Sequence, residues 1–419
     1  MSTTEQTFVI VGAGLAGASA AEALREQGFA GRVVITGDED EHPYNRPPLS
    51  KDYLQGASER DKVFLHPDGW YADQNIELRV GTRVTSIDRV NHQVSTQNGE
   101  TISYDTLLLA TGSAPRRLEV PGAELAGVLY LRRLGDCEAM RTAFAGAHRV
   151  AILGGGWIGL ETAVAARAAG CEVTVVERGE LPLLRVLGRE LAEIYAAVHR
   201  GHGVQLRVDA TVAEITGVSG RANGVRLADG SLIEADAVVV GVGITPNTEL
   251  AEASGLTIDD GVLVDEHLAT NDPDIFAAGD VANAYYPMLG THLRLEHWFA
   301  AEKQGPVAAL NMLGGAASYD QVPYFFSDQY DMGMEYSGYV GAEGYDEVVF
   351  RGDVDQGRYV AFWLRDRRVL AGMNVNVWDQ TDTITDLVRS HAHVDRSRLI
   401  DPCTPLAEVR ADPTTGAPS

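Results

Sequence analysis

Cysteine is nearly absent from this sequence. The 419 residues include three, Cys137, Cys171 and Cys403, which are too far apart to form a CxxC pair. An odd and scattered set of this kind is typical of a reducing compartment and excludes a secreted disulfide framework. We therefore expect thiols that pack as small hydrophobic groups, and a cytoplasmic location.

Positive charge and long apolar runs are also lacking. Lysine and arginine number 34 against 59 aspartates and glutamates, for a formal net charge of −25. Nucleic acids and anionic membranes bind basic surfaces, so this balance argues against both as partners. No segment approaches the roughly 18 consecutive apolar residues of a membrane span. The start, MSTTEQTFVIVGAG, has no basic segment, so we expect no signal peptide.

Glycine, in contrast, is plentiful, and it marks an internal repeat. The chain has 45 glycines, and its length predicts two or three domains. The segments FVIVGAGLAGASAAEALREQGF and VAILGGGWIGLETAVAARAAGC each join an apolar run, a GxGxxG motif and an Ala-rich stretch. Their periodicity predicts helices after the glycines and two pairs of strands: Phe8–Val11 with Arg32–Thr36, and Val150–Leu153 with Glu172–Val176.

Each copy of the repeat meets the contextual test for a dinucleotide-binding unit. Glycines of this motif make the turn, let a pyrophosphate approach the backbone and let helix and strand pack closely. The helix N-terminus then attracts the phosphates. A single GxGxxG is weak support, but two complete units in one chain indicate two dinucleotides and transfer between them. The motif glycines are Gly12, Gly14, Gly17, Gly154, Gly156 and Gly159.

Acidic residues close the second strand of each unit, where they would bind a ribose hydroxyl. Asp38 and Glu39 do so in the first unit and Glu177 in the second. Glu177 would repel a 2′-phosphate, which favours NADH over NADPH, although its neighbour Arg178 would accept one. The alternative for each acid is a solvated charge at a strand end.

Two further segments are typical of a flavin domain that is interrupted and then resumes. YDTLLLATGSAPR runs from a strand into a turn at Ala110, Thr111 and Gly112, and VVVGVGITPN is the matching exit from the second unit. TNDPDIFAAGDVAN predicts a strand that ends at Asp280, followed by a helical segment. Asp280 would accept hydrogen bonds from a ribityl chain, or would simply be an N-cap.

With these motifs and PYNRPPLSKDYL, the chain resembles the FAD-dependent ferredoxin reductases, over residues 8 to about 400. This is the putidaredoxin-reductase and biphenyl-dioxygenase-reductase group, related to the apoptosis-inducing factor. The resemblance implies an α/β, glutathione-reductase-like fold with two Rossmann-type domains and a C-terminal α+β domain. It implies these boundaries: FAD-binding 1–114 and 248–322, NAD-binding 115–247, C-terminal domain 323–402, and a disordered tail 403–419.

The loop between Gly37 and Gly56 contains no cysteine, although the disulfide-reductase relatives have a redox-active pair there. Without a thiol to relay electrons, the acceptor must meet the flavin by another route. The resemblance implies that Lys51 lies beside the flavin and pairs with Glu161, so that the cation raises the electron affinity of the flavin. The alternatives are a solvated lysine and a carboxylate at a helix start. Ser50 is expected to cap a helix from Lys51.

Other site residues follow from the resemblance one by one. Trp298, at a predicted helix start, would face the flavin or be a core aromatic, and Phe326 replaces a tryptophan frequent in the family. Gly305 and Pro306 predict a kink or early end of that helix. The remaining FAD contacts implied are Ala16, Arg46, Pro47, Val84 and Arg132, and the remaining nicotinamide-dinucleotide contacts are Ile158, Arg185, Gly243 and Glu296.

The function implied is a flavoprotein oxidoreductase, an NADH-dependent ferredoxin reductase without a metal site. NADH would reduce FAD, and single electrons would pass to a small iron–sulfur ferredoxin that serves a monooxygenase or dioxygenase. Ferredoxins of this type are acidic, so a basic patch would be needed, with Arg294 and Lys303 as candidates. The rivals are a partner-independent NADH oxidase or quinone reductase and an apoptosis-factor-like redox sensor. We expect a monomer, with a dimer left open.

Overall fold

Two parallel five-stranded sheets form the centre of the fold in the computed structural model, which describes residues 6–411. The first has the order β19-β7-β1-β2-β3 and the second the order β9-β16-β10-β11-β12. Their strands are β1 (Thr7–Val11), β2 (Arg32–Thr36), β3 (Ile76–Arg79), β7 (Thr106–Leu109) and β19 (Ile275–Ala277), then β10 (Arg149–Leu153), β11 (Glu172–Val176), β12 (Gln205–Arg207), β16 (Ala237–Val240) and β9 (Val128–Leu129). The strands predicted from the repeat are confirmed.

The repeat extends to the elements around each sheet. In each unit a helix of 12 residues follows the glycine turn, α1 (Leu15–Glu26) or α5 (Trp157–Ala168). Gly28 follows the C-cap of α1 with a φ of +77°, a conformation that glycine adopts without strain. A small antiparallel sheet accompanies each unit: β4 (Val84–Asp88), β5 (Gln93–Thr96) and β6 (Thr101–Ser103), or β13 (Val212–Val218), β14 (Arg221–Leu227) and β15 (Leu232–Glu234).

The chain crosses between the two units twice, and the crossings pair with each other. β8 (Ser113–Pro115) and β17 (Ile244–Pro246) form a two-stranded antiparallel ribbon. After α8 (Glu249–Ala253) the first unit resumes with β18 (Val262–Val264), β19, β20 (Ala282–Tyr286), β21 (Thr291–Leu293) and α9 (Trp298–Met312), which packs on α1. The first unit is therefore interrupted by the second in the sequence and resumes after it.

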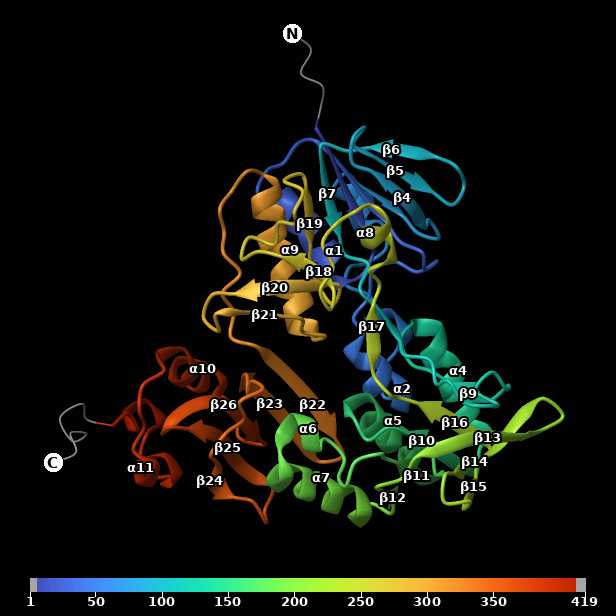
Figure 1. Cartoon of the computed structure of the whole chain (residues 1–419), viewed down its shortest axis with the longest axis vertical. Coiled ribbons are helices and arrows are strands. Elements are labelled where there is room, and N and C mark those ends of the chain that lie inside the picture. The colour runs from blue at the N-terminus through green and yellow to red at the C-terminus, as the bar shows by residue number, and fades with distance from the viewer. Residues whose placement is uncertain (1–5, 412–419) are drawn as a thin grey trace, which may run out of the picture.

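The third part of the molecule is an antiparallel sheet of order β22-β23-β26-β25-β24, lower left in Figure 1. Hydrophobic side chains of this sheet share one core with α7 (Arg189–Gly201) and α6 (Leu184–Leu187) of the second unit, and Trp363 Nε1 donates to Leu187 O at 3.0 Å. Its elements are β22 (Tyr324–Gln329), β23 (Met332–Gly338), β24 (Glu347–Asp353), β25 (Arg358–Arg365), β26 (Arg368–Val375), α10 (Thr381–Ser390) and α11 (Arg396–Ile400).

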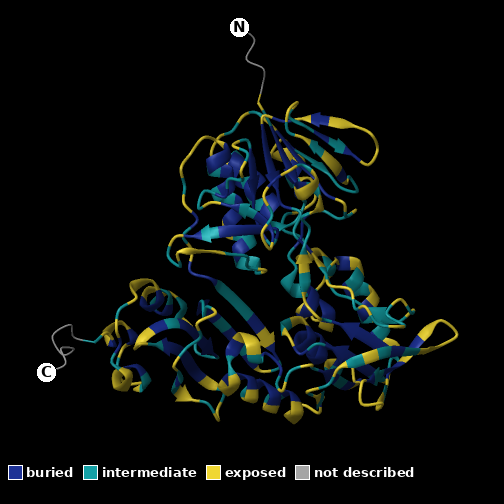
Figure 2. Ribbon diagram, in the orientation of Figure 1, coloured by how far each residue is buried: buried dark blue, intermediate teal, exposed yellow. Residues whose placement is uncertain are grey.

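The loop that follows β2 leaves its own unit. It forms η1 (Pro47–Ser50) and α2 (Asp52–Gln55), and α2 lies beside α5 and α4 (Leu134–Gly146) of the second unit (Figure 1). Leu49, Tyr53 and Leu54 are buried in the core of that second unit. Figure 2 shows that both parallel sheets are largely buried, whereas the exposed residues lie on the helices, the loops and the antiparallel strands around them.

Four local predictions were wrong. Residues after Asp280 form β20, not a helix, because they pair with both β18 and β21. Helix α9 continues through Pro306, since Gly305 packs so closely on α1 that a Cβ there would lie 2.5 Å from Ala16 O. Ser50 does not cap α2, because its hydroxyl group bonds Glu161 instead.

The predicted disordered tail was the fourth. Residues 403–411 are ordered: Leu406 and Val409 are buried and Val394 bridges Arg410. Residues 412–419 lie outside the described residues.

Candidate functional site

One cavity of about 1390 Å³ runs between the two glycine motifs. Its wall is shared by both parallel sheets, the η1 loop, the start of α9 and β22. No cysteine is among its lining residues. The three cysteines are reduced: Cys137 and Cys171 are buried and Cys403 is exposed. Burial raises the pKa of Cys137 to about 12, so this thiol is inert.

The first glycine motif is shaped by close contacts on one side and open space on the other. A Cβ on Gly12 would lie 2.0 Å from Ala110 O, and one on Gly17 would lie 2.1 Å from Gly12 O. A Cβ on Gly14 would meet nothing within 4 Å, because this residue faces the cavity. Two glycines thus let the backbones pack, and the third leaves room for a ligand at the start of α1.

The second motif repeats this geometry. A Cβ on Gly154 would lie 2.3 Å from Gly241 O, and one on Gly159 would lie 2.0 Å from Gly154 O. Gly156 again faces open space at the start of α5. The second unit therefore offers a phosphate-sized space at the same place as the first.

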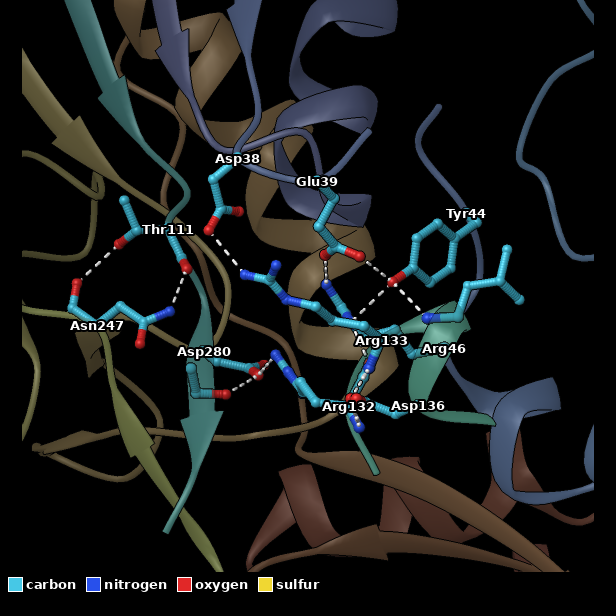
Figure 3. A network of polar contacts seen from close by, with 12 residues as sticks. Asp38, Glu39, Tyr44, Arg46, Thr111, Arg132, Arg133, Asp136, Asn247 and Asp280 are labelled. Atoms are coloured by element: carbon cyan, nitrogen blue, oxygen red, sulfur yellow. Dashed lines mark hydrogen bonds and ion pairs between the residues drawn. The ribbon is translucent and has the colours of Figure 1, made fainter. Parts of the chain in front are cut away.

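Arginines bind the acidic residues that end β2 (Figure 3). Arg46 Nη2 lies 2.9 Å from Glu39 Oε1, and Tyr44 donates to Glu39 Oε2 at 2.5 Å. Arg133 Nη2 lies 2.7 Å from Asp38 Oδ2. Burial and the nearby Glu39 raise the pKa of Tyr44 above its usual range, so the phenol remains a donor. Arg46 and Tyr44 belong to the loop that contains η1, and Arg133 directly precedes α4. Segments outside the first glycine motif therefore cover the side of the cavity where β2 ends.

Glu177, at the end of β11, has a different environment. Its Oε2 accepts from Gly155 N and its Oε1 accepts from Gly179 N, both at 2.7 Å. No lysine, arginine or histidine of the described chain forms an ion pair with it. Arg178 beside it is exposed. The carboxylate is thus held by backbone N–H groups of the glycine motif and of Gly179, and forms no ion pair within residues 6–411.

Asp280 lies deep in the cavity wall between two donors (Figure 3). Arg132 Nη2 lies 2.6 Å from Asp280 Oδ2, and Ser113 Oγ donates to the same oxygen at 2.7 Å. Burial would raise the pKa of Asp280, but Arg132 and Ser113 outweigh it and keep the pKa below its usual range. Asp280 is therefore an anion, and the proposed N-cap role does not apply, since a strand follows.

Lys51 and Glu161, predicted to pair, lie in contact. Lys51 Nζ is 2.6 Å from Glu161 Oε1, and both residues are buried at the cavity wall. Ser327 Oγ donates to the same oxygen at 2.6 Å, and Ser50 Oγ donates to Glu161 Oε2. The ammonium group also lies 5.4 Å from the ring centroid of Phe326. This site joins the η1 loop, α5 and β22, one element from each part of the molecule.

The start of α9 supplies the opposite wall. Trp298 lines the cavity, and its Nε1 donates to Asn45 Oδ1 at 2.8 Å, which ties the helix to the η1 loop. Burial lowers the pKa of His297 to about 4, so its ring is neutral. Burial also raises the pKa of Glu296, against the opposing effect of Arg294. Arg294 is in ion pairs with Glu296 and Asp260, and Lys303 is paired with Glu302.

Most of the predicted site residues line this one cavity, and a few do not. Gly17, Gly154 and Gly159 lie behind the turns, and Glu177 and exposed Arg185 lie outside the cavity. The structure brings the following predicted residues together at the cavity wall: Gly12, Gly14, Ala16, Asp38, Glu39, Arg46, Pro47, Lys51, Val84, Ala110, Thr111, Gly112, Arg132, Gly156, Ile158, Glu161, Gly243, Asp280, Glu296 and Trp298.

Among the cavity residues that were not predicted from the sequence, four contribute to the wall as follows. Asn247 exchanges hydrogen bonds with Thr111, with Nδ2 to Thr111 O at 2.7 Å and Thr111 Oγ1 to Asn247 O at 2.9 Å (Figure 3). Ser113 bonds Asp280, and His297 and Phe325 complete the wall near α9. Ser113 and Asn247 lie in the two segments that the sequence analysis identified as exits from the units. Because these segments pair as β8 and β17, residues beside the exits were the candidates that the sequence offered.

The wall fits a flavin dinucleotide at the first unit and a nicotinamide dinucleotide at the second. Gly14 and Gly156 leave open space at helix N-termini, where a pyrophosphate binds. Arg132 Nε is buried in the wall without a protein partner, a donor for a polar ligand group. In residues 6–411, no cluster of His, Cys, Asp and Glu suits a metal ion. None of the helices in that range is long and apolar enough to cross a membrane.

Residues 6–305 match the family described as pyridine nucleotide-disulphide oxidoreductase, and residues 324–410 match the reductase C-terminal family. This chain belongs to the pyridine nucleotide-disulphide oxidoreductase family. Membership implies FAD and NAD(P)H as cofactors, which agrees with the two open glycine motifs. It also confirms the resemblance and the glutathione-reductase-like fold inferred from the sequence.

Similar members of the family are ferredoxin reductases. Rhodocoxin reductase of Rhodococcus erythropolis is 41% identical over 370 residues, 88% of this chain and 86% of that protein. Putidaredoxin reductase of Pseudomonas putida is 36% identical over 408 residues, 96% of both chains. The solved structure of a covalent putidaredoxin reductase–putidaredoxin complex matches with a TM-score of 0.92 at 35% identity, covering 96% of this chain and 98% of the other.

Proposed function

We propose that this chain is an NADH-dependent ferredoxin reductase that supplies electrons to an oxygenase system. The observation that carries the proposal is the cavity itself. It connects the two glycine motifs, contains the Lys51–Glu161 pair and has no cysteine in its wall. An internal dithiol relay is therefore absent among the described residues, and the acceptor must receive electrons from the flavin site directly.

When bound, FAD accepts a hydride from a nicotinamide and releases electrons one at a time. The chain's own residues hold the reactants and set the charge around them. Gly12, Gly14 and the start of α1 would hold the flavin dinucleotide, and Asp280 would accept a hydrogen bond from its polyol. Asp38 and Glu39 would bind its ribose, Pro47 would pack against the flavin ring, and Arg46, Val84 and Arg132 would make further contacts with it.

Lys51 is the group that tunes the flavin, and Glu161 positions it. A buried ammonium group favours an electron-rich ligand beside it, and its carboxylate partner offsets the desolvation of the cation. Hydride transfer needs no protein acid or base, so these residues adjust the driving force and do not take part in bond making.

NADH is the proposed donor because Glu177 is unpaired at the end of β11. A ribose diol donates hydrogen bonds to such a carboxylate, whereas a 2′-phosphate would be repelled by it. Gly156, Ile158, Gly243 and Glu296 would contact the rest of the dinucleotide.

The proposed acceptor is a small iron–sulfur ferredoxin. The relatives include the putidaredoxin reductase solved in a covalent complex with putidaredoxin and, at 37% identity over 396 residues, the biphenyl dioxygenase system ferredoxin–NAD(+) reductase component of Paraburkholderia xenovorans. Arg294 and Lys303, the cations suggested for docking, are each paired with acids and do not form a basic patch. We therefore propose a docking surface that depends on short-range contacts rather than on attraction at long range.

The test is steady-state reduction of cytochrome c by the flavin-loaded protein, with NADH or NADPH, with and without a [2Fe–2S] ferredoxin. We expect strong dependence on the ferredoxin and a preference for NADH. Rapid turnover with oxygen or a quinone alone would support an oxidase or quinone reductase instead. Slow turnover with a persistent charge-transfer band would support a redox sensor.

A further inference from the structure

A chain of hydrogen bonds runs from Glu161 into the interior of the protein, away from the cavity. Ser327 Oγ donates to Glu161 Oε1 at 2.6 Å, and Gln329 Nε2 donates to Ser327 Oγ at 3.1 Å. Gln329 Oε1 lies 2.8 Å from His199 Nε2, where the chain ends. All four residues are buried, and His199 has no exposed surface. The chain links α5, β22 and α7, so it crosses the core that the second unit shares with the C-terminal sheet.

The direction of every bond follows from the two ends. At one end the Glu161 carboxylate accepts from Lys51, Ser50 and Ser327. Because Ser327 donates to Glu161, its oxygen is free to accept from the Gln329 amide, whose oxygen then faces His199. The imidazole must therefore hold its proton on Nε2. Its Nδ1 has no hydrogen-bond partner among residues 6–411, which an unprotonated nitrogen tolerates best.

Reversing the chain would require two changes together. If Glu161 were protonated and donated to Ser327, the serine would donate to Gln329 Oε1 and the amide would donate to His199 Nε2. The imidazole proton would then move to Nδ1, leaving a buried N–H with no acceptor. No other polar contact of the ring within residues 6–411 would compensate for that unsatisfied N–H group. The reversed direction of the hydrogen bonds is therefore less favourable than the observed one.

We propose that His199 is a positioning residue that acts through Gln329 and Ser327 to keep Glu161 an ionised partner of Lys51. This inference rests on the proposed function only for the flavin readout, because the protonation of His199 and Glu161 is a property of the protein alone. The other ionisable groups that face Glu161 are Lys51, Asp328 and Tyr195; burial raises the pKa of Asp328 and of Tyr195. None of them bonds to the Ser327–Gln329–His199 chain.

The first test reads protonation directly. Nitrogen-15 NMR of histidine-labelled protein, with and without FAD, should show His199 as the Nε2–H tautomer. Infrared spectroscopy should show no protonated carboxyl band assignable to Glu161 in the wild type, and such a band should appear in His199→Phe. An Nδ1–H tautomer in the wild type would overturn the proposal whether or not the protein proves to be a reductase.

The second test is a double-mutant cycle of His199→Phe and Ser327→Ala, read by the flavin midpoint potential and by the rate of flavin reduction in single turnover. Each single variant should raise the potential and change the rate of flavin reduction about threefold to tenfold, because protonation of Glu161 removes the negative charge that offsets Lys51. The His199 effect should disappear in the Ser327→Ala background, because the link is cut. Equal effects in both backgrounds would show that His199 acts only through packing and would reject the proposal.

His202→Phe is the matched control. His202 follows His199 by three residues, at the end of α7, and its ring centroid lies 3.6 Å from that of Tyr330. It takes no part in the hydrogen bonds that link Glu161 to His199. This variant should leave the potential unchanged. If His199→Phe does not fold, the NMR tautomer and the Ser327→Ala single variant still decide the matter, because a wild-type potential in Ser327→Ala would contradict the link.

Discussion

The two glycine-motif units of this molecule share strand order, glycine geometry and helix length. The acidic residues that follow the second strand of each unit, however, have different hydrogen-bond and ion-pair partners. Glu39 and Asp38 are bound by arginines supplied from the η1 loop and the segment before α4. Glu177 is bound only by backbone N–H groups of its own unit. The glycine motifs therefore provide the space for a dinucleotide, and the segments outside these motifs determine how far each site is enclosed.

This difference matches the two cofactor roles. A flavin must stay through many turnovers, and the proposed flavin site is closed by ion pairs whose partners come from segments outside the first unit's glycine motif. A nicotinamide dinucleotide must leave after each hydride transfer, and Glu177 and Arg185 lie outside the enclosed cavity. Substitutions in the first unit should therefore reduce flavin binding, whereas substitutions in the second should reduce activity with NADH.

The largest effect is expected from matched glycine substitutions, Gly14→Ala and Gly156→Ala. Both glycines have ordinary backbone angles and face open space, so the alanines should fold while their methyl groups obstruct the pyrophosphate. Gly14→Ala should purify with little flavin. Gly156→Ala should keep its flavin and lose about 100-fold in kcat/KM for NADH, about 2.7 kcal/mol. Flavin absorbance and steady-state kinetics are the measurements, and equal flavin loss in both would refute the assignment of the units.

The next effect concerns the buried pair that closes the flavin site. Arg132→Met leaves Asp280 charged without its cation, which should cost about 3–5 kcal/mol of unfolding free energy. The pKa of Asp280 is lowered in the folded state, so the pair contributes stability at neutral pH that is lost as pH falls through the lowered pKa, below about 4. Urea melts at pH 7 and at pH 3.5 measure this. The loss should shrink at the lower pH, and Arg133→Met, which breaks a more exposed pair, is the control.

Lys51→Met tests the place where the two units meet. Loss of the cation should lower the flavin midpoint potential and slow reduction by NADH about 10- to 100-fold. Stopped-flow reduction under anaerobic conditions measures the rate. Asp52→Asn, next along the chain and exposed, serves as a control for general damage to the η1–α2 loop. A Lys51→Met protein with full flavin content and unchanged potential and rate would remove the tuning role.

Glu177→Ala should change selectivity without changing flavin content. Removing an unpaired carboxylate next to exposed Arg178 should raise the NADPH to NADH ratio of kcat/KM by about tenfold, or about 1.4 kcal/mol. The corresponding change in the first unit, Glu39→Ala, should weaken flavin binding and leave the ratio unaltered. If the ratio stays constant in Glu177→Ala, Glu177 does not read the ribose.

The sequence predicted the repeated core well because that part of the fold is specified locally. Apolar runs, glycine spacing and Ala-rich helices place β1, α1, β2 and their counterparts, and the paired exits of the units were visible in the segments around Gly112 and Gly243. The resemblance supplied Lys51 with Glu161, which the chain brings together although they are 110 residues apart.

Predictions failed where tertiary packing outweighs local preference. Pro306 favours an early helix end, but α9 continues because Gly305 allows it to press against α1. Ala282–Tyr286 has no strong local preference for a strand, and two neighbouring strands decide it. Ser113 and Asn247 carry no motif, and their contacts exist only because β8 and β17 pair. The Arg46–Glu39 closure likewise depends on a loop that crosses between units.

The smallest effect concerns how the enclosed site meets its acceptor. The net charge is −25, and Arg294 and Lys303 are neutralised by neighbouring acids, so an acidic ferredoxin gains no long-range attraction from them. Raising the salt concentration from about 20 to about 200 mM shortens the screening length roughly threefold. Because this change weakens repulsion between two acidic proteins, the ferredoxin KM should stay unchanged or fall about twofold. Ferredoxin-dependent cytochrome c reduction measures this, with NADH-dependent ferricyanide reduction as the control for salt effects on the reductase. A KM that rises steeply with salt would reveal a basic docking patch and would reject docking by short-range contacts.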